Sequence, residues 1–68
     1  MKPLTEKDLF SMEGQTVMVM TFGLDDQICM VKIDEDQVHC ENDDYDFYYI
    51  NGDQPEGLFF VYGYDKNH

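Results

Sequence analysis

The sequence predicts a mainly β domain of the α+β class, in which a short N-terminal helix precedes a five-stranded antiparallel meander or small barrel. Apolar and aromatic runs recur along the chain, Gly, Asp and Asn bound most of them, and the connections between them are short. A chain of 68 residues has room for one domain, spanning 1–68, and for a modest core only.

The first predicted element is a helix over about 6–13. Thr5 is suited to the N-cap, Asp8 stands at the third helical position, and Leu9 stands where a hydrophobic staple would form. Gly14 then provides a stop signal. A helix this short carries few apolar residues, so we expect it to cover one end of the sheet.

The rest of the chain alternates β-branched and aromatic runs with turn residues, which predicts strands. The predicted strands cover residues of about 15–22, 27–33, 37–41, 45–50 and 58–64. The first two are apolar on both faces, so we expect both faces to be covered, by the sheet interior and by the helix or a second subunit. This element order resembles the Sm-like fold and, more loosely, SH3-type barrels. The glycine and asparagine signatures with which Sm-like proteins bind RNA have no counterpart here, so the resemblance implies a fold and no RNA-binding residues.

The charge balance limits the class of partner. The chain has 15 acidic residues against four lysines and no arginine, and its formal net charge is −11. Solubility of a small domain needs a net charge of about 2–8 in magnitude, and a larger surplus destabilises the compact state by self-repulsion. Such a charge repels nucleic acids and anionic membranes, and it favours a basic protein surface as the partner.

The sequence also predicts the compartment. No apolar run approaches the roughly 18 residues that a membrane span needs, and no basic segment precedes an apolar one as in a secretory signal. Two cysteines allow one disulfide at most. We therefore expect a soluble protein with reduced thiols in the cytoplasm, which is the host cytoplasm if the protein is phage-encoded.

The acidic residues cluster in the predicted turns. Consecutive turns of a meander alternate between the two ends of the sheet, so the first and third turns should share one end. Six carboxylates and three neighbouring tyrosines are the candidate partner-binding residues: Asp25, Asp26, Glu41, Asp43, Asp44, Asp46, Tyr45, Tyr48 and Tyr49. Carboxylates a few ångströms apart repel by about 1 kcal/mol even near water, so their crowding is costly unless something binds there.

Three interpretations of this cluster compete. Asp is common in turns for purely local reasons, because its side chain bonds the nearby backbone. A divalent-cation site is a second possibility, since Asn42-x-Asp44-x-Asp46 begins like an EF-hand loop. However, Phe47 stands where that loop needs Gly, and Asp53 stands where it needs Glu. We favour the third, in which the carboxylates imitate the closely spaced phosphates of a nucleic acid, and we expect no metal or other cofactor.

The sequence gives no sign of an enzyme. Cys29 and Cys40 share strand faces with apolar residues and are expected in the core, whereas His39 alternates with Cys40 and is expected at the surface. Paired Cys-x2-Cys units of structural zinc sites do not occur, and no arrangement of nucleophile, base and orienting acid can be supported.

These features together predict a non-enzymatic acidic inhibitor that binds the basic groove of a nucleic-acid-handling protein. In size, charge and aromatic content the chain resembles the small acidic DNA-mimic proteins of bacteriophages, including anti-CRISPR proteins and inhibitors of host nucleic-acid enzymes. Immunity proteins that neutralise a nuclease share the same physical character. The alternative is a small structural or oligomerising interaction subunit, for which a homodimer through an aromatic edge strand is the simplest form.

Overall fold

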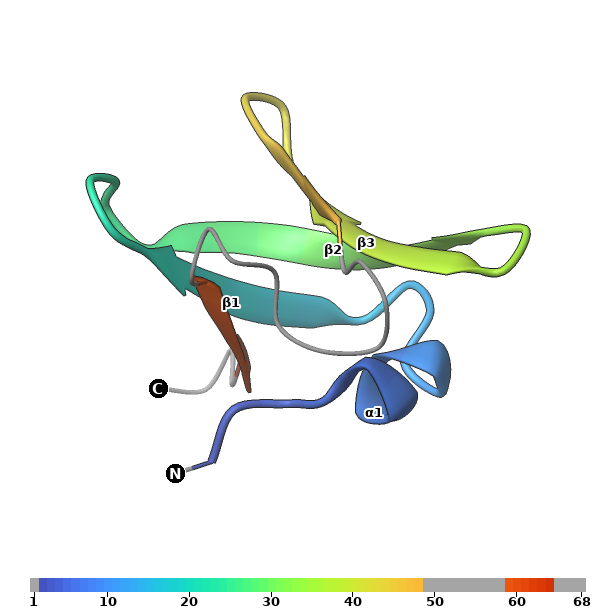
Figure 1. The fold of residues 1–68 in the computed structure, drawn as a ribbon. Coiled ribbons are helices and arrows are strands. Elements are labelled where there is room, and N and C mark those ends of the chain that lie inside the picture. Colours follow the sequence, from blue (N-terminus) through green and yellow to red (C-terminus); the bar gives the residue numbers. More distant parts are fainter. Residues whose placement is uncertain (1, 49–58, 65–68) are drawn as a thin grey trace.

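The computed structural model describes residues 2–48 and 59–64. Within these residues one short helix precedes five antiparallel strands that form a single sheet (Figure 1). The predicted fold class is therefore confirmed. The elements are α1 (Glu6–Phe10), β1 (Thr16–Thr21), β2 (Gln27–Asp34), β3 (Gln37–Glu41), β4 (Asp46–Tyr48) and β5 (Phe59–Gly63). The predicted end of the fourth strand at residue 50 and the predicted start of the fifth at residue 58 lie outside the described residues.

The strands follow the order β4-β3-β2-β1-β5 across the sheet. Strands β1 to β4 form a meander, in which each strand pairs with the next along the chain. Strand β5 pairs with β1, placing Val61 opposite Val19. In the part of the chain that the structure describes, β4 and β5 are the two edges and the sheet is not closed, so of the two predicted forms the open sheet is the one observed.

One face of the sheet carries the core. Side chains alternate along each strand, so Val17 and Val19 of β1 point to the same face as Cys29 and Val31 of β2. The predicted core positions of the two cysteines are confirmed, since both are free and buried. The buried core of the described residues consists of Leu9, Val17, Val19, Cys29, Val31, Val38, Cys40 and Val61.

Helix α1 begins where the sequence predicts and ends earlier. The hydroxyl of Thr5 accepts a bond of 3.1 Å from the N–H of Asp8, and the Asp8 carboxylate accepts one of 2.9 Å from the N–H of Thr5. The helix ends at Phe10 instead of residue 13, because the N–H groups of Ser11 and Met12 bond carbonyls only three residues back, which tightens the last turn. Its buried Leu9 joins the core, and α1 lies below the sheet near the start of β1 (Figure 1).

The outward face of the sheet carries apolar side chains that are partly exposed to solvent. Met20, Ile28 and Met30 point away from the core and are 37%, 41% and 42% exposed. Helix α1 packs against the core face, so cover of the outward face by a second subunit stays a prediction. Among the described residues, no helix has the length and apolar content that crossing a membrane would take.

Candidate functional site: an acidic end of the sheet

Asn42 joins the two turns at one end of the sheet. Its Nδ2 atom donates to Oε1 of Gln27 at 3.0 Å and to the carbonyl oxygen of Ile28 at 3.2 Å, at the start of β2. Its Oδ1 atom accepts the backbone N–H groups of Asp44 and Tyr45, both at 2.8 Å. The turn between β3 and β4 is thus tied to the strand that leaves the turn between β1 and β2, as the alternation of turns predicts.

A second amide extends this connection. Nε2 of Gln27 donates to the carbonyl oxygen of Asp25 at 3.0 Å, so hydrogen bonds run without interruption from Asp25 to Tyr45. Figure 1 shows the β1–β2 turn at one end of the sheet and the β2–β3 turn at the other, and the β3–β4 turn projects away from the sheet between them. Two neutral amide side chains therefore hold two acidic turns next to each other.

Four exposed carboxylates occupy these two turns, and we refer to them as the acidic end: Asp25, Asp26, Asp43 and Asp44. Within residues 2–48 and 59–64, no ion pair involves any of the four. Carboxylates that share a small area without cations repel each other. None of the four is therefore neutralised by an ion pair with a described residue.

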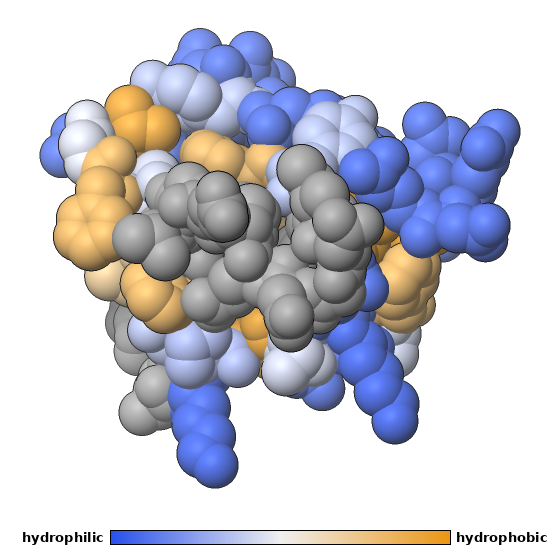
Figure 2. All heavy atoms as spheres, in the orientation of Figure 1, coloured by the Kyte–Doolittle hydropathy of each residue, from blue (hydrophilic) through white to orange (hydrophobic). Residues whose placement is uncertain are grey.

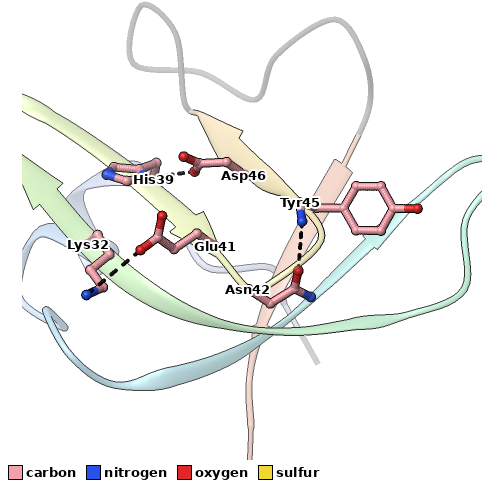
Figure 3. A network of polar contacts seen from close by, with 6 residues as sticks. All are labelled: Lys32, His39, Glu41, Asn42, Tyr45 and Asp46. Carbon is pink, nitrogen blue, oxygen red and sulfur yellow. Dashed lines mark hydrogen bonds and ion pairs between the residues drawn. The ribbon is translucent and has the colours of Figure 1, made fainter.

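The other two predicted carboxylates have partners inside the chain. Lys32 on β2 pairs with Glu41 on β3, with 3.8 Å between Nζ and Oε1, and His39 Nδ1 lies 2.7 Å from Asp46 Oδ1 (Figure 3). These four side chains lie together on the outward face of the sheet. Exposed pairs such as Lys32 and Glu41 contribute about 0–1 kcal/mol. Glu41 and Asp46 are thus less available to a partner than the acidic end is.

His39 is buried, and its predicted surface position is wrong. Only 8% of the residue is exposed, because the Tyr48 ring stacks on the imidazole at a centroid distance of 4.5 Å and Asp46 contacts its Nδ1. The physical reason is the register of the β3–β4 hairpin, which sets His39 opposite Tyr48. Partial burial of the Tyr48 hydroxyl, together with the Asp46 carboxylate, raises the pKa of Tyr48. This pair was missed because alternation within one strand says nothing about the facing strand.

The tyrosines predicted beside the acids are partly anchored. Tyr45 is 39% exposed and stacks on Phe47 at a centroid distance of 5.8 Å, while Phe47 packs against the core. Tyr48 is 38% exposed. Each ring is therefore partly exposed and partly packed against another ring of the chain. Tyr49 lies outside the described residues.

One set of side chains has the composition of a metal site. Ligand atoms of His39, Glu41 and Asp46 lie within 4.8 Å of one another. Imidazole and carboxylate ligands suit several divalent transition metals. Each of the three already has a partner within the chain, as described above. In the EF-hand-like pattern, the Oδ1 atom of Asn42 is likewise occupied by two N–H groups. An ion at either place would therefore compete with contacts that these side chains already make.

The contact between Nδ1 of His39 and the carboxylate of Asp46 resembles the pairing of base and orienting acid in a catalytic triad. A nucleophile would have to stand on the same face. The thiols of Cys29 and Cys40 lie on the opposite, core-facing side, where burial raises their pKa to about 11 and about 12. Both thiols are therefore neutral near pH 7 and are poor nucleophiles.

No protein-family model matches the chain, and comparisons with curated proteins and with solved structures find no match. The function of the acidic end is therefore inferred from its geometry and charge alone.

Proposed function

We propose that the protein is a non-enzymatic acidic inhibitor that binds the basic groove of a nucleic-acid-handling protein through its acidic end. The observation that carries this proposal is the link through Asn42, which gathers two acidic turns without a neutralising cation among the described residues. A partner rich in lysine and arginine would supply the missing positive charge. The net charge of −11 would also speed the encounter.

The chemistry of the acidic end suits such a groove. Carboxylates accept paired hydrogen bonds from a guanidinium group, in the way that phosphates do. Tyr45 and Tyr48 add flat aromatic surface on which an arginine can stack. We place this activity in the cytoplasm, where nucleic-acid-handling enzymes work and where buried free thiols such as Cys29 and Cys40 stay reduced. Phage DNA mimics and nuclease immunity proteins are both of this kind.

The test compares two variants of equal charge. Each neutralises three carboxylates, which changes the formal net charge from −11 to −8. The acid-end variant alters the tied turns, and the far-end variant alters the end of β2 and the β2–β3 turn. The substitutions are Asp25→Asn, Asp43→Asn and Asp44→Asn in the first, and Asp34→Asn, Glu35→Gln and Asp36→Asn in the second.

Each immobilised protein is incubated with bacterial lysate at about 0.1 M and about 0.5 M salt, since screening weakens exposed charge pairs. We expect the unmodified protein and the far-end variant to retain the same nucleic-acid-binding protein at low salt. The acid-end variant should lose it, and high salt should release it. The unmodified protein should also displace labelled DNA from the captured partner. Equal loss in both variants, or no displacement of DNA, would refute the proposal.

A structural or oligomerising subunit is the second candidate, and the exposed apolar side chains of the outward face favour it. In that case light scattering would show a dimer or larger assembly of the protein alone. Neutralising the acidic end would then leave the assembly intact or strengthen it, since two copies that each carry a charge of −11 repel.

A further inference from the structure

The outward face has a hollow beside the acidic end. Its lining comes from the end of β1, from β5 and from the turn that follows β1, and its volume is about 250 Å³. Met20 and Phe60 are paired neighbours on β1 and β5, and Phe22 is 76% exposed at the edge. Among the residues that the structure describes, the lining consists of Met20, Thr21, Phe22, Asp26 and Phe60. The hollow is thus an apolar surface with one carboxylate of the acidic end at its margin.

This combination selects one kind of occupant. The volume of about 250 Å³ is below the roughly 300–1,000 Å³ of most small-molecule pockets, so a single side chain fits better than a whole ligand. Lysine and arginine bury an apolar stem against hydrophobic surface and keep a charged head in a polar setting. Their cations are also attracted to aromatic faces such as those of Phe22 and Phe60.

The same pattern recurs along the outward face. Ile28 and Met30 are exposed on β2, and the groove that they line includes Asp43 together with the paired side chains of Lys32 and Glu41. Figure 2 shows hydrophobic and hydrophilic side chains mixed at the surface around the end of the sheet that carries the β1–β2 turn. Apolar patches with carboxylates beside them fit a segment with several long cationic side chains. A second copy of this chain is disfavoured, because it has four lysines against 15 acidic residues.

We propose that the hollow binds a lysine or arginine side chain of the basic partner, with the stem against Met20, Phe22 and Phe60 and the charged head at Asp26. This inference rests on the proposed function and adds to it the anchoring residue of the partner. Binding then depends on apolar contact as well as on charge.

The experiment separates stem length from charge. Calorimetry measures the affinity for two capped peptides, one of alternating lysine and glycine and one in which 2,4-diaminobutyric acid replaces each lysine. The second peptide carries the same ammonium group on a shorter stem. Phe22→Ser removes an aromatic wall that is already 76% exposed, so folding should be preserved, and a urea midpoint checks this. Leu24→Ser is the matched control, since Leu24 is exposed on the same turn and does not line the hollow.

We expect Phe22→Ser to weaken binding of the lysine peptide about three- to ten-fold, roughly the effect of exposing one to two CH₂ groups of the stem, and to leave the short-stem peptide unchanged. Leu24→Ser should change neither, and Asp26→Asn should weaken both. Equal affinities of the Phe22→Ser and Leu24→Ser variants for the lysine peptide would overturn the hollow as the anchoring site. So would a dimer of the unmodified protein that Phe22→Ser converts to a monomer. Either result would leave the proposed function standing. The proposed function is refuted if the acid-end variant still retains the captured partner.

Discussion

Replacing Asn42 by alanine tests whether the acidic end is built by neutral hydrogen bonds. The substitution changes no charge and removes a side chain that is only partly exposed. It deletes two bonds donated to Gln27 and Ile28, of 3.0 and 3.2 Å, and two bonds of 2.8 Å accepted from Asp44 and Tyr45. The two acidic turns then lose the side chain that ties them together.

The expected cost follows from those four bonds. A hydrogen bond contributes about 0.5–1.5 kcal/mol net, and less where water can replace the lost partner. The N–H groups of Asp44 and Tyr45 lie in an exposed turn and can bond water, whereas Gln27 is half-buried. We therefore expect Asn42→Ala to lower the free energy of unfolding by about 2–3 kcal/mol. For a small domain that is a large share of the total stability, which is about 5 kcal/mol at the low end of the usual range.

Equilibrium urea unfolding, followed by circular dichroism, measures this cost. Asn42→Asp is the first control: it keeps the Oδ1 acceptor, loses the Nδ2 donor and adds a charge. Gln27→Ala is the second, and it removes the side-chain bond across the two turns at a cost of about 1 kcal/mol. A loss below about 0.5 kcal/mol for Asn42→Ala would show that the turns keep their places without the amide, and would refute the reasoning.

The same variant links stability to binding. Because Asn42→Ala leaves the net charge unchanged, attraction at long range should be preserved while the two turns lose their fixed spacing. We expect weaker binding of the captured partner with little change in its salt dependence. Unchanged affinity would mean that the partner responds to total charge and not to the arrangement of the acidic end.

The remaining predictions concern the core and the helix. Leu9→Ala should cost about 2–5 kcal/mol in urea unfolding, because Leu9 is fully buried and its removal leaves a cavity. Thr5→Ala should cost about 1 kcal/mol by removing the N-cap. Bonds from the backbone and hydroxyl of Thr5 hold the pKa of Asp8 below its ordinary value of 3.8. The stability that these bonds contribute is therefore present above pH 3.8 and is lost as the pH falls through the lower pKa of the folded state. Because Thr5→Ala removes the hydroxyl bond, the urea midpoint of this variant should change less in acid than that of the unmodified protein. Iodoacetamide should alkylate Cys29 and Cys40 slowly at about pH 8 and rapidly in denaturant, as mass spectrometry would show, since burial raises the pKa of both thiols.

Local features of the fold were predictable because their causes are local. The capping box needs only Thr5 and Asp8 at the right spacing, and the core positions of Cys29 and Cys40 need only their alternation with apolar neighbours on the same strand. The end of the helix was not predictable from Gly14, because the bonds of Ser11 that tighten the last turn compete closely with continuing the helix. Small energy differences of this kind leave no mark in the residue pattern.

Features that join distant segments were predicted in outline only. Alternation of turns correctly placed the two acidic turns at one end, but the bond from Asn42 to Gln27 spans 15 residues and has no sequence signature. The burial of His39 depends on the register that sets it opposite Tyr48. Of the two predicted forms, the five-stranded meander sets the last strand beside β4, and a closed barrel would pair it with β1 as well. The structure pairs β5 with β1, which sets Phe60 beside Met20 in the hollow.

The choice of side chains at the acidic end is the strongest argument for a partner. Two carboxylates of the outward face have a partner inside the chain, since Lys32 pairs with Glu41 and His39 contacts Asp46. At the acidic end the connecting side chains are amides, which fix position and leave the charge of the neighbouring carboxylates intact. An arrangement selected for stability alone would gain from a lysine there, because like charges held close together raise the energy of the folded state. The arrangement is instead the one expected if the positive charge arrives with another molecule.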